Sequence, residues 1–325
     1  MGTIFDGTSV LVTGGTGSFG KHMIQTLLSE TKIRRVIVLS RDELKQFEMQ
    51  QHYRNEHRLR FFIGNVRERD RLLRAFDGVD YVIHAAALKQ VPAAEYNPFE
   101  AIKTNIHGAQ NIIDAAIDRG VKKVVALSTD KASSPINLYG ATKLVSDKLF
   151  VSGNAYAGNS DCRFAVVRYG NVVGSRGSVV PLFRRLAATG DPIPITDERM
   201  TRFWITLEQG VRFVMNAFEK MHGGEVFVPK IPSMNVVDLA KALAPNTPIR
   251  VVGIRPGEKL HEEMISETDA RRTMDVGDYY VIQPEFEWWN ASKVQGTTLP
   301  DGFSYSSDKN DDWLDVARLQ AMVNG

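Results

Sequence analysis

Two short groups of polar residues carry the chemistry that this sequence suggests. Thr129, Asp130 and Lys131 follow a short apolar segment, and Tyr139 and Lys143 come soon after, four positions apart. In a helix this spacing places both side chains on one face. A cationic lysine beside a phenol favours the phenolate and lowers the phenol's pKa, which would make Tyr139 a base near neutral pH. The pattern predicts a site for acid and base chemistry.

The context of this tyrosine and lysine supports the interpretation. The same spacing recurs at Tyr305 and Lys309, in a polar tail without a preceding strand, and we interpret that pair as a solvent-exposed coincidence. Residues 123–127 form a continuous apolar run, which is typical of a parallel strand buried on both faces. Ligands of open α/β sheets bind beyond the carboxyl ends of such strands. The polar segment Ser128 to Lys131 is therefore well placed for catalysis.

A glycine-rich loop near the start of the chain predicts a dinucleotide site. It lies between a strand pattern at residues 9–12 and a helical pattern at 21–28. Glycines there permit a tight turn, close approach of the backbone to a pyrophosphate and close helix packing, while amides at the helix start bind the anion. The residues of this loop predicted to bind the cofactor are Gly14, Thr16, Gly17, Ser18, Phe19 and Gly20.

The end of the second strand, residues 35–39, indicates which dinucleotide is bound. An NAD site usually offers an acidic residue at this point for the ribose hydroxyls. Here Arg41 can pair with a 2'-phosphate through two parallel hydrogen bonds, so NADP is favoured. Asp42 and Glu43 remain alternative ribose ligands.

Strand and helix patterns alternate through the first half of the chain. Further strands are predicted at 59–63, 81–84 and 163–169, with helices at 44–57 and 99–119. This alternation predicts an α/β fold, a doubly wound parallel Rossmann sheet with a smaller C-terminal α/β substrate lobe. His84 is interpreted as a packed strand residue. The predicted domains are 1–170 for the dinucleotide, joined by 205–228; 171–204 and 229–285 for the substrate lobe; and 286–325 for a tail and last helix.

The composition is that of an ordinary globular protein, with 43% hydrophobic and 24% charged residues among 325. A net charge of +2 argues against binding to nucleic acid or to a membrane surface. No apolar run approaches the ~20 residues that span a bilayer. Cys162 is the single cysteine, which excludes an internal disulfide, and without a signal peptide we expect a cytoplasmic protein. The histidine spacing predicts no metal site.

These motifs resemble the extended short-chain dehydrogenase/reductase family, and within it the inverting UDP-N-acetylglucosamine 4,6-dehydratases of pseudaminic acid biosynthesis. The similar segments are 13–20, 40–43, 84–92, 128–132, 139–143, 168–172, 174–183, 200–203 and 255–259. Asp130 with Lys131 and the 174–183 loop are the more specific pieces. One departure is Asn65, where the family usually has aspartate. Asparagine keeps an acceptor for the adenine amino group but loses the charge, so we expect an effect on affinity.

The resemblance implies a reaction that uses and regenerates a tightly held NADP+. Tyr139 as phenolate would take the proton of the sugar 4-hydroxyl while hydride leaves C4, and Thr129 would hydrogen-bond that hydroxyl. Lys131 would then remove the C5 proton, Asp130 would protonate the leaving 6-hydroxyl, and hydride would return to C6. A base must be neutral part of the time, which burial and the positive charge of Lys143 would promote for Lys131.

The resemblance also implies the remaining contacts. For the cofactor they are Ser40, Arg41, Lys45, Asn65, Val66, Ala85, Ala86, Ala87, Lys89, Asn105, Tyr139 and Lys143. For the substrate, UDP-N-acetylglucosamine, they are Lys89, Asn171, Ser178, Val179, Val180, Arg202, Arg255 and Glu258. A homo-oligomer is implied as well, with the helix at 44–57 as one candidate surface.

Three alternatives stay open at this point. A nucleotide-sugar 4-epimerase shares the tyrosine and lysine but has no need of an acid and base at Asp130 and Lys131. A 4,6-dehydratase that retains configuration at C5 typically has glutamate where this chain has Lys131. An NADP-sensing regulator on the same fold commonly lacks the tyrosine and lysine, so Tyr139 and Lys143 favour an enzyme.

Overall fold

Short apolar segments form a central sheet in the computed structural model, which describes residues 2–174, 179–286 and 294–324. Its strands are β1 (Ser9–Thr13), β2 (Arg35–Ser40), β3 (Leu59–Ile63), β4 (Tyr81–His84), β5 (Lys123–Leu127), β6 (Arg163–Val167), β10 (Val226–Pro229), β14 (Thr273–Asp275), β15 (Tyr279–Ile282) and β16 (Thr297–Thr298). The order across this 10-stranded sheet is β16-β14-β15-β10-β6-β5-β4-β1-β2-β3. Neighbouring strands in the part of this order that runs β10-β6-β5-β4-β1-β2-β3 are all parallel. The predicted doubly wound sheet is therefore confirmed.

The sheet is not parallel throughout. Strands β15, β14 and β16 add an antiparallel edge beside β10, whereas sequence analysis placed these segments in the substrate lobe and the tail. The turn between β14 and β15 contains Gly277 with φ +99°, a conformation that glycine adopts without strain. Strands this short carry little periodicity, which is why the sequence did not indicate them.

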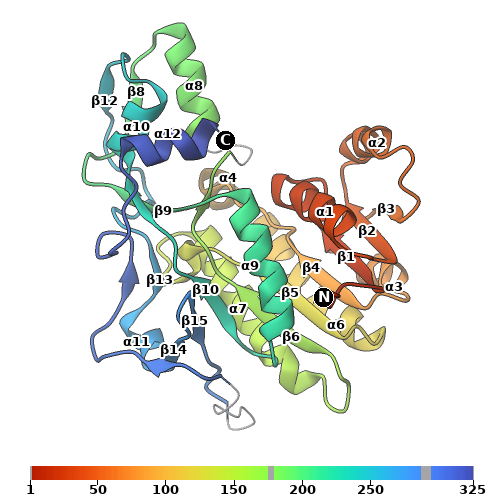
Figure 1. The fold of residues 1–325 in the computed structure, drawn as a ribbon. Coiled ribbons are helices and arrows are strands. Elements are labelled where there is room, and N and C mark those ends of the chain that lie inside the picture. The colour runs from red at the N-terminus through yellow and green to blue at the C-terminus, as the bar shows by residue number, and fades with distance from the viewer. Residues whose placement is uncertain (1, 175–178, 287–293, 325) are drawn as a thin grey trace.

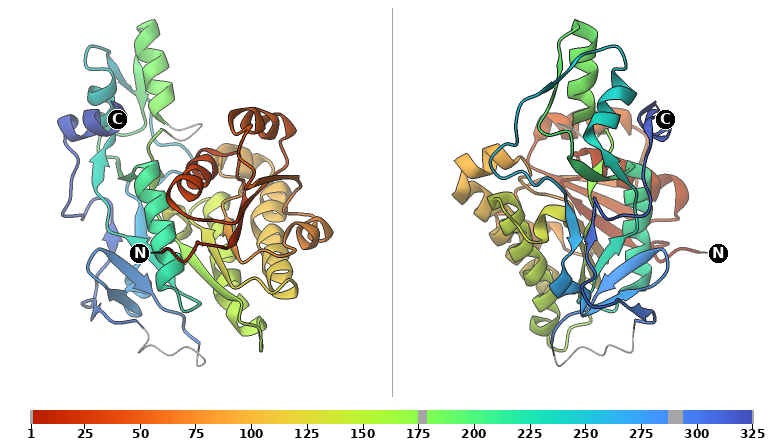
Figure 2. Two further views of the ribbon diagram at one scale, coloured as in Figure 1. Left: turned by 45° about the vertical axis from the view of Figure 1, so that its right-hand side comes forward. Right: turned by 90° about the vertical axis from the view of Figure 1, so that its left-hand side faces the viewer.

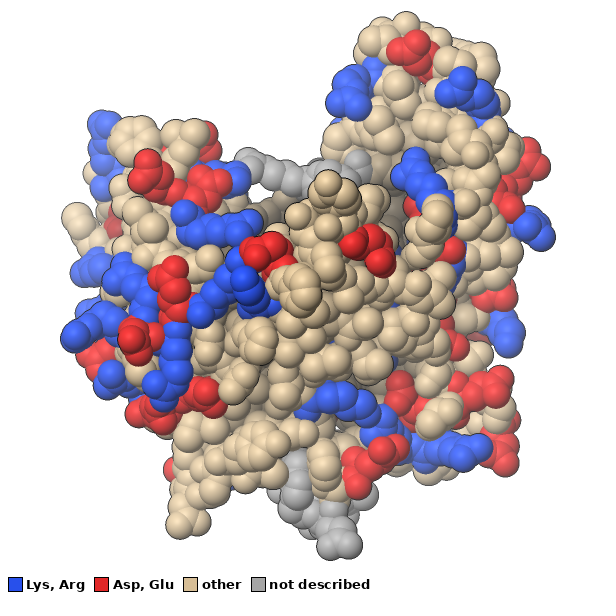
Figure 3. All heavy atoms as spheres, turned by 180° about the vertical axis from the view of Figure 1, so that it is seen from behind, with Lys and Arg blue, Asp and Glu red and all other residues tan. Residues whose placement is uncertain are grey.

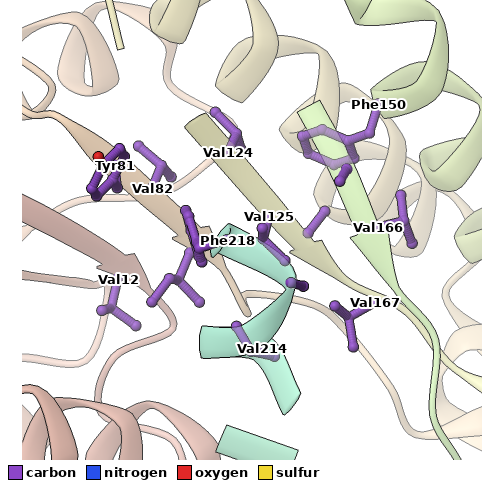
Figure 4. Packing of buried hydrophobic residues seen from close by; sticks show 14 of the residues in the cluster. Val12, Tyr81, Val82, Val124, Val125, Phe150, Val166, Val167, Val214 and Phe218 are labelled. Atoms are coloured by element: carbon purple, nitrogen blue, oxygen red, sulfur yellow. The ribbon is translucent and has the colours of Figure 1, made fainter. Parts of the chain in front are cut away.

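Helices cover both faces of the sheet (Figures 1 and 2). One face carries α1 (Ser18–Glu30) and α9 (Leu207–Lys220), which pack on each other, and the other carries α3 (Arg69–Ala75), α6 (Gly108–Asp118) and α7 (Leu138–Tyr156). Figure 4 shows the core between these layers, with Phe150 from α7 and Phe218 from α9 among valines of the strands. Successive strand residues point to opposite faces, so each strand contributes to both layers of core.

Two predicted helices differ in detail. The predicted helix at 44–57 is wrong in extent, because α2 (Glu43–His52) ends where Tyr53 leaves the helical conformation. The predicted helix at 99–119 is a continuous helical stretch made of α5 (Pro98–Ile102), the π-helix η1 (Lys103–His107) and α6. Single π turns inside helices are frequent at functional sites. This one turns Asn105 into the protein interior.

The smaller lobe stands above the carboxyl end of the parallel strands (Figure 1). It contains β7 (Asn171–Val172), α8 (Val179–Thr189), β8 (Ile193–Ile195), β9 (Thr201–Ile205), β11 (Ser233–Asn235), α10 (Val236–Leu243), β12 (Ile249–Val251) and α12 (Val316–Asn324). Two apolar clusters hold it together, one around Trp204 and Leu239 and one around Phe183 and Ile193. The last helix begins at Val316, three residues later than predicted, because Trp313 is bridged to Ser233 instead.

Two global properties bear on possible partners. Among the described residues, no helix combines the length and apolar character required to cross a membrane. Basic and acidic side chains are interspersed on the face seen in Figure 3. That face therefore offers no continuous field of one sign of the kind that attracts a polyanion.

Candidate active site

A cleft of ≈ 740 Å³ lies beyond the carboxyl ends of the parallel strands. The surface is hollowed between the smaller lobe and the side of the molecule that carries α2 (Figure 3). Most of the residues predicted to act in catalysis or binding line this one cleft: Gly14, Thr16, Gly17, Ser18, Phe19, Gly20, Ser40, Arg41, Asn65, Val66, Ala85, Ala86, Ala87, Lys89, Thr129, Asp130, Lys131, Tyr139, Lys143, Asn171, Val179, Arg202, Arg255 and Glu258. Lys45, Asn105 and Val180 are not among its lining residues, and Ser178 lies outside the described residues.

The glycine-rich loop has the geometry that a pyrophosphate needs. Gly14 has φ +64°, and a Cβ there would lie 3.0 Å from the backbone of Ala86. A Cβ on Gly20 would lie 2.6 Å from the Cα of Gly15, so only glycine lets the first turn of α1 pack this closely. Gly17 precedes the helix and supplies no side-chain cap. The amino end of α1 is the kind of helix terminus that attracts an anion.

The end of β2 is arranged around a short polar cluster. The hydroxyl oxygens of Thr16 and Ser40 are 2.8 Å apart. The Asp42 carboxylate accepts a hydrogen bond of 3.0 Å from the backbone N–H of Lys45 and forms an ion pair with the Lys45 ammonium. Asp42 thereby caps α2, and its partner Lys45 is held away from the cleft. Arg41 is exposed and lines the cleft.

Asn65 and Asn105 have different roles. Asn65 lines the cleft, and its side-chain oxygen accepts a hydrogen bond of 3.2 Å from the backbone N–H of Arg67. Asn105 was predicted to contact the cofactor, but it is buried and bonds both the N–H and the C=O of Leu88 at 2.9 Å. Its amide also donates to Thr142 at 3.0 Å. Asn105 therefore positions the segment after β4 from behind, because the π turn directs it inward.

His84, at the end of β4, is a packed residue as predicted. It is buried, and its Nδ1 lies 2.8 Å from the hydroxyl of Thr13 at the end of β1. That hydroxyl accepts a hydrogen bond from the backbone N–H of Ala86. Burial, together with the nearby charge of Lys143, lowers the pKa of His84 to about 3. A neutral His84 thus links the two strand ends that carry the cofactor loops.

Lys131 lies between two buried carboxylates. Its Nζ is 3.1 Å from Oδ1 of Asp130 and 2.9 Å from Oε1 of Glu262. Burial lowers the pKa of Lys131, but the two carboxylates outweigh burial and raise it above the usual lysine value. The prediction that burial and Lys143 favour a neutral Lys131 is therefore wrong for this structure. Because a carboxylate lies on each side of its Nζ, Lys131 remains an ammonium.

Tyr139 also differs from the expectation. Burial raises its pKa to about 12, while the charge of Lys131 and the hydrogen bond between Tyr139 and Thr129 act in the opposite direction. Lys143 donates instead to the backbone carbonyl of Leu127 at 2.7 Å. The prediction that Lys143 lowers the pKa of the phenol is thus wrong for this structure. Burial also lowers the pKa of Lys143, and Asp147 opposes this shift.

Local backbone structure holds the polar segment in place. Asp130 to Ala132 form a single 3-10 turn, η2, in which Thr129 is the N-cap and its hydroxyl donates to Asp130 at 2.8 Å. The helix α7 begins at Leu138, and Asn137 caps it by accepting from the N–H of Gly140. A Cβ at Gly140 would lie 2.1 Å from the carbonyl oxygen of Lys131. Close packing of α7 against this turn therefore brings Tyr139 beside it.

The lobe supplies the other wall of the cleft. Arg202 from β9 donates to the backbone carbonyl of Leu260 at 3.0 Å, and its Nε lies 3.8 Å from Glu262. Arg255 lies 3.8 Å from Glu258. Sequence reasoning missed Glu262, because it follows no strand of the main sheet and belongs to no recognisable motif. Its proximity to Lys131 arises only from docking of the lobe.

Comparisons with known proteins agree with this geometry. The family model described as polysaccharide biosynthesis protein matches residues 10–284. A protein of Campylobacter jejuni named UDP-N-acetylglucosamine 4,6-dehydratase (inverting) is 57% identical over 330 residues, which cover 99% of this chain and 98% of that protein.

Solved structures show the same fold. Pen from Bacillus thuringiensis has a TM-score of 0.91 and 37% identity, covering 99% of both chains. DesIV, a dTDP-glucose 4,6-dehydratase from Streptomyces venezuelae solved with NAD bound, has a TM-score of 0.70 and 25% identity, covering 78% of this chain and 86% of that one. The chain therefore belongs to the polysaccharide biosynthesis protein family, within the extended short-chain dehydrogenases/reductases.

Proposed function

We propose that the chain is an NADP-dependent UDP-N-acetylglucosamine 4,6-dehydratase that inverts C5, as its relative of 57% identity is named. The product would be UDP-2-acetamido-2,6-dideoxy-β-L-arabino-hex-4-ulose, the first intermediate of pseudaminic acid biosynthesis. The observation that carries this proposal is the contact between Lys131 and Asp130 in the cleft that Tyr139 also lines. An acid and a base side by side are what elimination of water across C5 and C6 requires.

The cleft fits a nicotinamide dinucleotide, because the glycine loop lets the backbone come close to a pyrophosphate at the amino end of α1. The bound nicotinamide would take hydride from C4 of the sugar and return it to C6. Asp42 is already engaged by α2 and Lys45, which leaves it poorly placed to bind a ribose hydroxyl. Arg41 lines the cleft at the same point, and its planar guanidinium suits a 2'-phosphate. These two features favour NADP over NAD.

Tyr139 would take the proton of the 4-hydroxyl. Its raised pKa means that Tyr139 is a phenol at neutral pH, and a bound oxidised nicotinamide would supply a positive charge that favours the phenolate. Thr129 would hydrogen-bond the same hydroxyl. Lys143 bonds the Leu127 carbonyl and remains available to ribose hydroxyls at the cleft wall.

The pair Asp130 and Lys131 would perform the elimination. Transfer of one proton across their 3.1 Å contact converts ammonium and carboxylate into amine and carboxylic acid. The amine then takes the C5 proton, and the acid protonates the departing 6-hydroxyl, which leaves as water. Both groups are returned to their charged forms by these two transfers. Water would deliver the last proton to C5 from the opposite face, which gives inversion. Tyr139 would release to solvent the proton that it took from the 4-hydroxyl, which balances the turnover.

The substrate would be held mainly by the lobe formed by residues 171–204 and 229–285. Arg202 and Arg255 are suited to the diphosphate, because each guanidinium can bind two oxygens at once. Lys89, whose pKa is lowered by partial desolvation of its ammonium, also lines the cleft. Asn171, Val179 and Glu258 complete the predicted sugar and uridine contacts.

We also propose that the protein is a cytoplasmic homo-oligomer. Helix α2 exposes Leu44 by 63% and Phe47 by 57%, and large apolar side chains exposed together favour association. The single cysteine, Cys162, is buried and free, which is consistent with a reducing compartment. Light scattering at micromolar concentration tests the assembly, and a monomer would contradict it.

The direct test is incubation with UDP-N-acetylglucosamine in deuterated water, followed by mass spectrometry and NMR. Loss of water with solvent deuterium at C5 and L-arabino configuration in early product is expected. A product of unchanged mass and inverted C4 would indicate an epimerase. Retained configuration at C5 would show that Lys131 has another role, and absence of any turnover would favour a sensing protein.

A further inference from the structure

Glu262 is a buried carboxylate that contacts Lys131 from the C-terminal part of the chain. Only 2% of its surface is exposed. Oε1 lies 2.9 Å from Nζ of Lys131 and 3.8 Å from Nε of Arg202, and the backbone N–H donates to Ser307 at 2.9 Å. Its other oxygen, Oε2, has no hydrogen-bond partner in the described part of the chain. Such a carboxylate is costly to bury, so its place in a catalytic cleft calls for a function.

The charges around Lys131 show what Glu262 contributes. Asp130 must change between acid and carboxylate if it is to protonate a leaving group. During that exchange it cannot hold the ammonium of Lys131 permanently. Glu262 makes an independent contact on the same nitrogen, and it comes from a segment that is anchored separately, through Ser307. The ε-amino group is therefore kept in place whichever form Asp130 takes.

We propose that Glu262 is a positioning residue for Lys131, which holds the ε-amino group at C5 and stabilises the ammonium formed during elimination. This inference rests on the proposed dehydratase function. Glu262 stays a carboxylate throughout, while the C5–H proton goes to the Lys131 amine and the proton of Asp130 leaves with the 6-hydroxyl as water. A negative charge 2.9 Å from the nitrogen favours arrival of that proton but opposes the earlier transfer to Asp130. The contribution of Glu262 to the rate is therefore the position in which it holds the nitrogen.

The test compares Glu262→Gln with Glu262→Asp. Glutamine keeps the size and an acceptor oxygen but removes the charge, whereas aspartate keeps the charge on a shorter side chain. In single-turnover reactions, C4 oxidation is followed by nicotinamide absorbance and water loss by mass spectrometry. For Glu262→Gln we expect oxidation close to the unsubstituted rate and water loss about 10²-fold slower, the scale of a misplaced catalytic group. Glu262→Asp should recover part of the loss.

A neighbouring glutamate provides the matched control. Glu263 accepts hydrogen bonds from Ser133 at 2.9 Å and Ser134 at 2.7 Å, and its carboxylate belongs to no ion pair with Lys131. Both serines donate to the same oxygen, Oε2, and Glu263→Gln keeps one acceptor oxygen, so both steps should stay near the unsubstituted rates. If Glu262→Gln slows oxidation and water loss by the same factor, Glu262 only maintains the fold. Water loss at the original rate would also overturn the proposal.

A second readout does not depend on turnover. Reductive methylation with formaldehyde modifies neutral amines, and Lys131 can be followed by peptide mass spectrometry at one pH. Removing the Glu262 charge leaves less ammonium, so labelling of Lys131 should be faster in Glu262→Gln and unchanged in Glu263→Gln. Equal labelling of Lys131 in the unsubstituted protein, Glu262→Gln and Glu263→Gln would show that Glu262 does not stabilise the ammonium form of Lys131. If the unsubstituted protein releases no water, the proposed function is wrong, and the role in elimination is refuted with it.

Discussion

Protonation of His84 should destabilise the fold at mildly acidic pH. His84 is buried between β1 and α7, where it packs against Phe150 and bonds Thr13. Burial, with a smaller contribution from the charge of Lys143, lowers its pKa from 6.5 to about 3. The folded protein therefore resists protonation of this ring, whereas the unfolded chain accepts a proton near pH 6.5.

The size of the effect follows from these two values. The pKa of His84 is lower in the folded protein than in the unfolded chain. The stability gained by burying a neutral His84 is therefore fully present above about pH 6.5 and is lost as the pH falls toward 3. At pH 5 the unfolded state gains about 2 kcal/mol from protonation of this one ring, with almost no compensation in the folded state. That is a large part of the roughly 5–15 kcal/mol by which proteins are stable.

Urea unfolding of the unsubstituted protein and His84→Asn between pH 7.5 and 5 would measure this difference. Asparagine can still bond Thr13 but cannot be protonated in this range. The His84→Asn variant loses the packing of the ring, so it should be less stable than the unsubstituted protein at pH 7.5. By pH 5 the difference in unfolding free energy between the two proteins should shrink by about 2 kcal/mol. Other titrating groups cancel in the comparison. A gap that stays constant with pH would refute the reasoning.

Three further predictions concern the cleft. Lys131→Ala should retain transient reduction of the nicotinamide while water loss falls by ~10²- to 10⁴-fold, because Tyr139 stays intact; fast dehydration would contradict this. NADP should be the nucleotide released on denaturation, and Arg41→Ala should weaken NADP binding by about 10- to 100-fold with little effect on NAD, as measured by calorimetry. Gly140→Ala should lower stability to urea by about 1–3 kcal/mol, since its Cβ would meet the Lys131 carbonyl at 2.1 Å, whereas Gly210→Ala has open space and should not.

The parallel sheet is predictable from the sequence because each strand is a short apolar run followed by a motif with its own chemistry. The glycines at 14, 17 and 20 mark the first turn, and the polar segment at 128–131 marks the end of β5. Motifs of this kind act through residues close in sequence. Their place in the cleft follows once the strands are parallel and their carboxyl ends share one edge.

The electrostatics are not predictable in the same way. The spacing of Tyr139 and Lys143 indicates a shared helix face, but it cannot reveal that Lys143 bonds the Leu127 carbonyl. Likewise, nothing near Lys131 in sequence predicts Glu262, whose contact depends on how the lobe docks. The pKa of a buried group is set by burial and by every charge around it, and both are properties of tertiary structure.

The origin of Glu262 has a consequence for how the site is assembled. Asp130 and Lys131 belong to a turn after β5, whereas Glu262 and Arg202 come from the segments that form the other wall of the cleft. Without those segments, Lys131 would keep one carboxylate and face solvent. With them, the ammonium lies between two carboxylates whose side chains are only 1% and 2% exposed, where charges interact more strongly than in bulk water. The acid and base chemistry that we propose at C5 thus requires both walls, whereas the cofactor loops are held by the sheet and the helices that flank it.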